Sequence, residues 1–155
     1  MIPSALPPEP LQAVQHIRRM RGGSQAHLMR ASNSQYYVVK FRNNPQDVRI
    51  LANEYLGTKL GTLLGLPMPE AGILDVPESL IALSRELKIE NGALTVPCVS
   101  GLQFGSRYIA DPHNAPVFDY LPETILNRVS NRQDFHACSC SISGPATAMA
   151  VKPCS

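Results

Sequence analysis

The amino-acid sequence predicts an α+β fold in which one helix packs on an antiparallel sheet. Three observations lead to this prediction. The first third of the chain holds three short segments with tight connections, a strongly marked helix follows them, and further strand-like segments come after the helix. Strands joined by tight turns pair as an antiparallel meander, and a helix with one apolar face must bury it against such a sheet. With 155 residues, the chain has the length of one domain.

The first elements follow a Pro-rich lead-in over residues 1–12. The run LQAVQHIRRM is moderately apolar and fits a helix or a strand on pattern alone. A Gly-Gly break separates it from HLMRAS, which is short and strand-like, and the polar turn NSQ leads into YYVVKFR. This last run is dense in aromatic and β-branched residues and is the clearest strand of the sequence.

The helix after these strands has well-marked ends. Asn44 is predicted to cap it, Pro45 suits the first helical position, and Asp47 provides a negative charge in the first turn. Gly65 and Pro67 end the helix. Apolar residues recur between these ends at intervals of three and four, and the face that they predict consists of Ile50, Leu51, Tyr55, Leu56, Leu60, Leu63 and Leu64.

Further strands are predicted after the helix. AGILDV is strand-like, and KIENGALTV contains Asn91-Gly92 between two apolar arms, which is a strong signal for a hairpin. APVFDYLPE is predicted to be a strand that runs into a bend, and ETILNRVSNRQDF has the pattern of an amphipathic helix.

Composition limits the classes of partner. A net charge of +2 is too small to argue for nucleic acid or for a membrane surface, and the basic run Arg18, Arg19 and Arg21 is interpreted as a solvated strand end. The N-terminus lacks the pattern of a signal peptide, and no apolar run approaches the roughly 20 residues of a membrane span. A cytoplasmic location is therefore expected, with neither nucleic acid nor membrane as a partner.

Lys40 is the residue that first points to chemistry. Alternation places it on one face of its strand together with Tyr36 and Val38, and a lysine on such an apolar strand needs a partner or a water-facing cleft. Glu54 on the following helix is the candidate partner. A Gly-rich turn over residues 21–25 lies upstream, where bare backbone N–H groups could approach phosphate oxygens.

Together these features form an ordered set, with a Gly turn between the first two strands, a lysine on the third and a glutamate on the next helix. That order is typical of the upper lobe of a protein-kinase-type fold. The sequence resembles the HipA-like kinase domain of largely uncharacterised bacterial proteins. The likeness runs from about Val14 to Phe135 and rests on the motifs GGSQ, YYVVKF, NNP before the helix, GLQFGSRY and VFDYLPETILNRVSN.

The resemblance implies a protein-kinase-like N-terminal lobe over residues 13–117 that binds ATP, with Mg²⁺ as the cofactor of the full-length family. It implies that Lys40 binds the phosphates, that Glu54 orients Lys40, and that Val38 forms part of the roof over the adenine. Residues 118–122 would be the hinge between lobes. The nucleotide-binding residues implied in this way are Gly22, Gly23, Ser24, Gln25, Val38, Lys40, Glu54, Tyr120 and Leu121.

The resemblance also implies that the large lobe is missing. Residues 118–137 would hold the hinge and the first helix of that lobe, and no Asp, Glu or Asn follows Phe135. A kinase needs such residues to hold magnesium and to orient the acceptor hydroxyl, so no catalytic residue and no metal ligand is assigned. The chain is expected to be the inactive ATP-binding half of a phosphotransferase whose acceptor is a protein hydroxyl. The alternative is a non-catalytic nucleotide-sensing or protein-interaction module.

The last segment, residues 138–155, is interpreted as a sequence read out of frame. Permitted codons shifted by one base from the end of the Ser139 codon encode LFDKWTGNGDGRQTVF, which resembles the catalytic stretch FDKWTGN-x-D-x-RQ of the same family. A disordered tail is therefore expected. The competing hypothesis is a zinc site formed by Cys138, Cys140 and Cys154, although C-x-C lacks the usual two-residue spacing.

Overall fold

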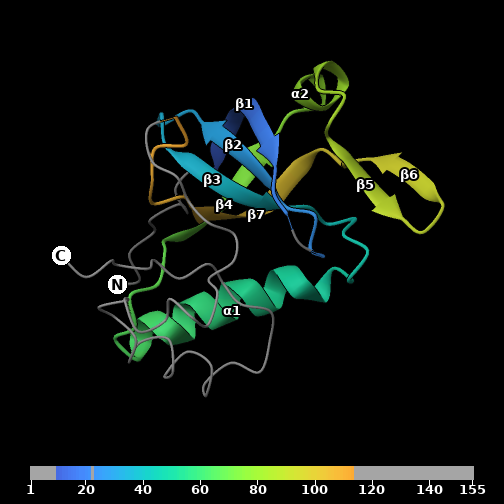
Figure 1. The fold of residues 1–155 in the computed structure, drawn as a ribbon. Helices are drawn as coiled ribbons and strands as arrows, with labels where there is room; N and C mark the ends of the chain where they lie inside the picture. Colours follow the sequence, from blue (N-terminus) through green and yellow to red (C-terminus); the bar gives the residue numbers. More distant parts are fainter. Residues whose placement is uncertain (1–9, 22, 114–155) are drawn as a thin grey trace, which may run out of the picture.

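The structure, a computed structural model, describes residues 10–21 and 23–113. It is an α+β fold, as predicted, in which a closed five-stranded barrel is accompanied by a separate hairpin and two helices (Figure 1). The elements in chain order are β1 (Leu11–Arg19), β2 (His27–Ala31), β3 (Tyr36–Lys40), α1 (Arg49–Leu63), β4 (Ala71–Val76), α2 (Glu78–Leu83), β5 (Lys88–Asn91), β6 (Leu94–Pro97) and β7 (Gly101–Arg107).

The barrel has the strand order β1-β2-β3-β7-β4. Strands β1, β2 and β3 form the predicted antiparallel meander, and β7 lies between β3 and β4. The sheet is not purely antiparallel, because β1 pairs in parallel with β4 through Leu11 and Leu74 and closes the barrel. Hydrophobic periodicity shows which residues of a strand face a core, but it does not identify the strand next to it, so this pairing was not predicted.

The core fills the interior of the barrel. Along β3, Tyr37 and Val39 are buried and the residues between them are only partly so, which matches the predicted alternation. Leu80 and Ile81 of α2 pack against the core. Its buried members are Ala13, Met29, Ala31, Tyr37, Val39, Phe41, Leu74, Val76, Leu87, Ile89 and Cys98.

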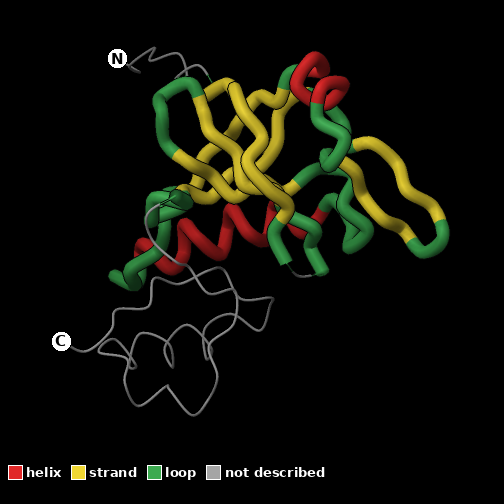
Figure 2. The backbone as a smooth tube through the Cα atoms, turned by 45° about the horizontal axis from the view of Figure 1, so that its top comes forward, coloured by secondary structure: helices red, strands yellow, loops and turns green. Residues whose placement is uncertain are grey.

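The segment that fitted either a helix or a strand is strand β1. The hairpin predicted at Asn91-Gly92 is also present, and it projects from the barrel as β5 and β6 (Figures 1 and 2). Gly92 has a positive φ of 61°, which residues other than glycine rarely adopt. Strand β7 and the short helix α2 were not predicted from the sequence.

The beginning of α1 differs from the prediction. The helix starts at Arg49, and Val48 precedes it without a side-chain cap. Asn44 instead accepts a hydrogen bond at Oδ1 from the N–H of Gln46, at 2.8 Å, within a turn. Asp47 has a φ of 85° and also lies before the helix, where its Oδ1 accepts from the N–H of Arg49. Asn44, Pro45 and Asp47 therefore belong to the linker before α1. They were misassigned because turns favour the same residue types as helix caps.

The end of α1 agrees with the prediction. Gly65 has a φ of 75°, and its N–H donates to the carbonyl oxygen of Thr62. A glycine in this conformation just after the last turn is the common way to end a helix.

The buried face of α1 shares only Ile50 with the predicted one. Its buried residues are Ile50, Glu54, Thr58 and Gly61, whereas the leucines are largely exposed, with Leu63 at 84%. Small and polar residues occupy much of the buried stripe, and the loop after α1 approaches it closely. A Cβ added at Gly61 would lie 2.7 Å from Cγ of Met68. Periodicity found the leucine stripe and missed the packed one, because the packed stripe is not apolar.

The strand expected over residues 115–123 and the helix expected over residues 123–135 lie outside the described residues. Neither α1 nor α2 is long and apolar enough to cross a bilayer, and the described part of the chain contains no other helix.

Candidate functional site

The site is built around an ion pair between β3 and α1. Nζ of Lys40 lies 2.6 Å from Oε1 of Glu54, and the two side chains are only 12% and 5% exposed. The alternation along β3 places Lys40 on the face opposite to the buried Tyr37 and Val39. Helix α1 crosses below the barrel in both views (Figures 1 and 2). The structure thus brings together the lysine and the glutamate that the sequence paired.

The surroundings of the pair hold it in place. Lys40 is opposite Phe104 in the register of β3 and β7, and Phe104 is 3% exposed. On the helix, Thr58 lies one turn after Glu54, and its hydroxyl donates to the carbonyl oxygen of Glu54 at 2.8 Å. Close pairing of two opposite charges offsets part of the cost of removing both from water.

Val38 and the Gly-rich turn are placed by the same strands. Val38 is half-buried two residues before Lys40 and pairs with Leu28 on one side and Ser106 on the other. The turn connects β1 to β2, and the first residue of β2, His27, pairs with Val39. The turn and Lys40 therefore lie at the same end of the barrel.

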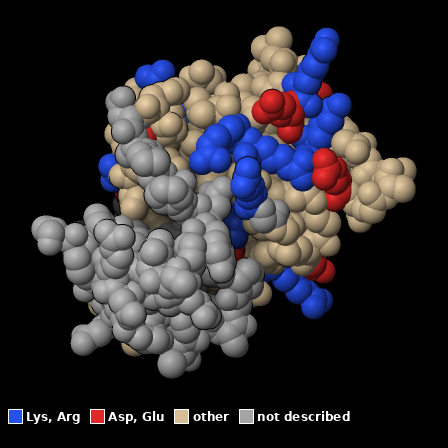
Figure 3. All heavy atoms as spheres, in the orientation of Figure 1, with Lys and Arg blue, Asp and Glu red and all other residues tan. Residues whose placement is uncertain are grey.

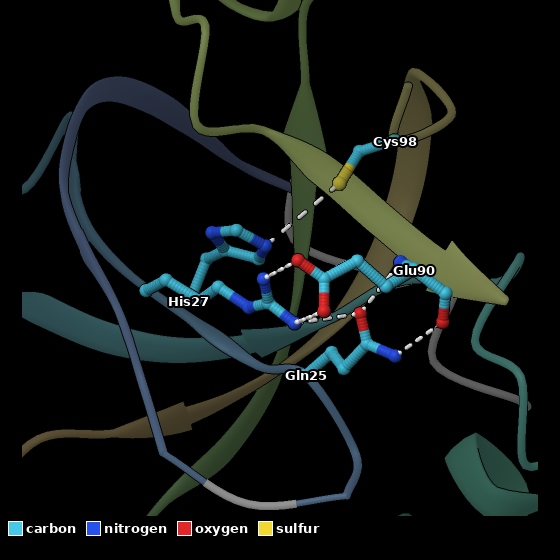
Figure 4. A network of polar contacts seen from close by, with 5 residues as sticks. Gln25, His27, Glu90 and Cys98 are labelled. Carbon is cyan, nitrogen blue, oxygen red and sulfur yellow. Dashed lines mark hydrogen bonds and ion pairs between the residues drawn. The ribbon is translucent and has the colours of Figure 1, made fainter. Parts of the chain in front are cut away.

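The described part of the turn is held from two sides. The side-chain amide of Asn44 donates to the carbonyl oxygen of Ser24, and a Cβ added at Gly23 would lie 2.9 Å from Nε2 of Gln46. On the other side, Nε2 of Gln25 donates to the carbonyl oxygen of Glu90 at 2.6 Å, and Oε1 of Gln25 accepts from the N–H of Glu90 at 2.8 Å (Figure 4). The side chain of Gln25 is therefore directed to the hairpin.

Three of the predicted nucleotide-binding residues, Gly22, Tyr120 and Leu121, lie outside the described residues. So do the whole predicted hinge and the cysteines of the alternative zinc hypothesis. Among residues 10–21 and 23–113, no group of three or more potential metal ligands is found.

Sequence reasoning missed the contacts of Arg19. Its guanidinium donates to both carboxylate oxygens of Glu90, at 2.8 and 3.2 Å, and to Oε1 of Gln25 at 2.9 Å. The hydrogen bond between Arg19 and Glu90 raises the pKa of the arginine and lowers the pKa of the glutamate. Arg19 and Glu90 are 71 residues apart, so no local pattern could have indicated their contact.

Figure 3 shows the distribution of charge on one face of the molecule. Lys and Arg side chains gather over the strands of the barrel on the face shown, and Asp and Glu side chains lie next to them. Arg19 is thus partly neutralised rather than free, which fits the interpretation of the basic run as a strand end.

A second polar cluster lies inside the fold. Nδ1 of His27 is 3.1 Å from Nε2 of His16, and Nε2 of His27 is 3.9 Å from Sγ of Cys98 (Figure 4 shows the contact with Cys98). Burial, together with the nearby His16 and Arg19, lowers the pKa of His27 to about 4. Burial also raises the pKa of Cys98 from 9.0 to about 12.

Cys98 is expected to be inert in the folded protein. Since only the thiolate reacts, a pKa of about 12 leaves roughly one thiol in 10⁴ ionised at pH 8. Brief treatment with iodoacetamide at pH 8, followed by peptide mass spectrometry, should leave Cys98 unmodified, whereas treatment in 6 M guanidinium should modify it. Rapid modification of Cys98 in the native protein would contradict its burial between His27 and the barrel core.

The fold and the ion pair together define a class of protein, an α+β barrel domain with a buried lysine–glutamate pair between its third strand and the next helix. The sequence model of a family described as HipA-like kinase matches residues 13–124, more than two thirds of the chain. The chain therefore belongs to the HipA-like kinase family. Comparison with curated proteins and with solved structures found no match.

Membership of this family indicates a kinase-related function, and kinases in general use ATP together with Mg²⁺.

Proposed function

We propose that this chain is the ATP-binding half of an ATP-dependent phosphotransferase, in the manner of the upper lobe of a protein kinase. The observation that carries the proposal is the buried pair of Lys40 and Glu54, whose charged atoms are 2.6 Å apart. In protein kinases a lysine on the third strand contacts the phosphates of ATP, and a glutamate on the following helix orients that lysine.

The chemistry of the pair supports this role. An ammonium group has three donors, so one can be held by Glu54 while the others remain for phosphate oxygens. The carboxylate also offsets the cost of placing the ammonium where there is little water, and a charged donor binds a phosphate oxygen more strongly than a neutral one. In the proposal, Glu54 orients the donor and Lys40 makes the contact.

The remaining predicted residues are given roles around this pair. Gly23 and Ser24 supply backbone N–H groups to the phosphates, because a turn with small residues allows close approach. Val38 covers one face of the adenine, on the same strand face as Lys40. The assignment of Tyr120 and Leu121 to a hinge that contacts the adenine edge remains part of the proposal.

Transfer of phosphate is not assigned to these residues. The described ranges 10–21 and 23–113 contain no group of three or more potential metal ligands. A kinase requires such groups at the transferred phosphate. The proposal is therefore nucleotide binding by the present chain, with an acceptor that by family analogy is a protein hydroxyl.

A second candidate function is a protein-interaction or nucleotide-sensing module without chemistry. The exposed leucines of α1 favour it, because Leu56, Leu60 and Leu63 are 64%, 49% and 84% exposed on one helix. Magnesium-dependent phosphoryl transfer by a longer chain that includes a large lobe would decide for the kinase, and persistent absence of transfer would decide for the module.

The proposed role of Lys40 is tested by the affinity for ATP. Lys40→Ala should weaken ATP binding by about tenfold or more, because it removes a charge-assisted contact to phosphate. Glu54→Ala should weaken it less. Isothermal titration calorimetry with ATP and with adenosine measures both effects, and adenosine affinity should change little because adenosine has no phosphate.

Lys59→Ala is the matched control, since Lys59 is an exposed lysine on α1 whose Nζ lies 5.4 Å from the ring centre of Tyr55. The double variant Lys40→Met with Glu54→Gln removes both charges, so it tests the loss of the lysine without leaving a buried charge unpaired. Wild-type affinity for ATP in that folded double variant would overturn the assignment of Lys40.

A further inference from the structure

Gln25 is held in an unusual way for a residue of a turn. Its φ is 45°, in the region that residues other than glycine seldom adopt, and its side-chain amide makes three hydrogen bonds. Two of them go to the main chain of Glu90, and the third comes from Arg19. An unfavourable backbone conformation persists only where the surroundings fix it, and here the side chain provides that fixation.

The two bonds to Glu90 have the geometry of strand pairing. Glu90 lies in β5, opposite Thr95 of β6. The amide of Gln25 donates to the carbonyl oxygen of Glu90 and accepts from its N–H, so the side chain of Gln25 takes the place of a neighbouring strand at this residue. The hairpin is thereby connected directly to the turn, although the two are separated by 65 residues.

The opposite side of the turn is held by the linker that leads to α1. Asn44 is 5% exposed, and its amide donates to the carbonyl oxygen of Ser24. Its Oδ1 accepts a hydrogen bond from the N–H of Gln46, and its main-chain N–H donates to the carbonyl oxygen of Phe41. The turn therefore lies between two supports, one in the hairpin and one in the segment that joins Lys40 to the helix of Glu54.

We infer that Gln25 and Asn44 are positioning residues that hold Gly23 and Ser24 of the Gly-rich turn from both sides, in the conformation that faces the nucleotide phosphates. This inference rests on the proposed function for its ligand and on the hydrogen bonds for its geometry. Gln25 acts through its contact with the hairpin, so its side chain positions the turn and does not touch the nucleotide.

The first test measures the turn itself, without any nucleotide. Gln25→Ala should speed amide hydrogen exchange in the turn by about tenfold at Met20, whose N–H donates to the carbonyl oxygen of Ala26 across the turn at 2.8 Å, because it removes the hydrogen bonds that hold the turn to the hairpin. Gln15→Ala is the control, since Gln15 is an exposed glutamine of β1, and exchange in the turn should stay at the wild-type rate. Unchanged exchange in Gln25→Ala would overturn the inference.

Asn44→Asp provides a second variant, with an intact side-chain acceptor for the N–H of Gln46. The carboxylate keeps the Oδ1 position but cannot donate to Ser24, so the support from the linker alone is lost. Exchange in the turn should again rise, while the far end of β2 should keep its protection. A general rise over all the barrel strands would mean that Asn44 serves stability and does not position the turn.

The second test adds the ligand. Gln25→Ala should weaken ATP binding about five- to tenfold and leave adenosine binding unchanged, because the turn faces only the phosphates. Equal losses of affinity for ATP and for adenosine would mean that Gln25 serves the stability of the fold and does not position the turn. If the wild-type chain binds no ATP, the proposed function fails, and the exchange experiment alone then decides whether the two supports hold the turn.

Discussion

Replacing Lys40 by methionine is expected to lower the free energy of unfolding by about 3–5 kcal/mol at pH 7. Methionine keeps most of the apolar stem and removes the ammonium group, so the change is mainly one of charge. Glu54, with a side chain only 5% exposed, would then be a carboxylate without its partner at 2.6 Å. A buried charge that loses its counter-charge retains the cost of its desolvation.

Urea unfolding followed by circular dichroism measures this effect, provided that the slope of the unfolding free energy against urea concentration is the same in both proteins. The expected change corresponds to a fall in the melting temperature of roughly 10 °C for a chain of this size. Lys59→Met is the matched control, because Lys59 is an exposed lysine on α1, the helix that carries Glu54. Its effect on the free energy of unfolding should stay within about 0.5 kcal/mol.

The double variant Lys40→Met with Glu54→Gln should recover much of the lost stability. Both charges are then absent, and replacing a buried ion pair by neutral groups is often close to neutral for stability. If the losses in Lys40→Met and Glu54→Gln simply added up in the double variant, the two side chains would not interact, and this would contradict their contact at 2.6 Å.

Acid is expected to destabilise the protein through His27. This imidazole is fully buried, and its pKa is lowered from 6.5 to about 4 in the folded state. Between these two values the unfolded chain binds a proton that the folded chain does not, so stability falls as the pH falls from about 6.5 to 4. The difference of about 2.5 units corresponds to a loss of about 3 kcal/mol, complete near pH 4.

The groups around His27 determine how much of the pH dependence of stability is due to His27 itself. Desolvation is the main cause of the lowered pKa, and His16 and Arg19 add to it as nearby cations. Burial lowers the pKa of His16 as well, against the opposing effect of Glu86, so His16 contributes loss of stability in the same direction. Urea unfolding at pH 7, 6, 5 and 4 should show the decline.

His27→Gln is the diagnostic variant, because glutamine can still hydrogen-bond to its neighbours but does not titrate. Its unfolding free energy should depend less on pH than that of the wild type over this range. His113→Gln changes an exposed histidine and should leave the pH dependence as it was. If the unfolding free energy of His27→Gln fell with decreasing pH as much as that of the wild type, other groups would be its cause.

Much of the fold was predictable because strands and turns are specified locally. YYVVKFR, AGILDV and Asn91-Gly92 each contain the residues that their structures require, and all three predictions are confirmed. The start of α1 was predicted wrongly because Asn, Pro and Asp suit turns as well as helix ends. The packed face of α1 was also missed, since it depends on close approach at Gly61 and on a charge pair rather than on apolar residues.

For the site, the sequence indicated Lys40 and Glu54 because a lysine within an apolar strand needs a nearby partner. It could not indicate Arg19, Gln25 and Glu90 as a network, since Gln25 and Glu90 are 65 residues apart and each is an ordinary polar residue by itself. Such contacts arise only when the hairpin folds back beside the barrel. The pair of Lys40 and Glu54 could therefore be predicted from the sequence, whereas the hydrogen bonds that support the turn could not.

Closure of the barrel has a consequence for synthesis of the chain. Strand β1 is made first, yet its partner β4 begins at Ala71, and β3 and β4 are joined only through β7, which ends at Arg107. While the ribosome is still adding these residues, the meander has two open edges that can pair with other chains. Pairings over such long sequence separations also form slowly. The nascent protein is therefore most prone to aggregation before residue 107 has emerged, and in this interval a chaperone would help it most.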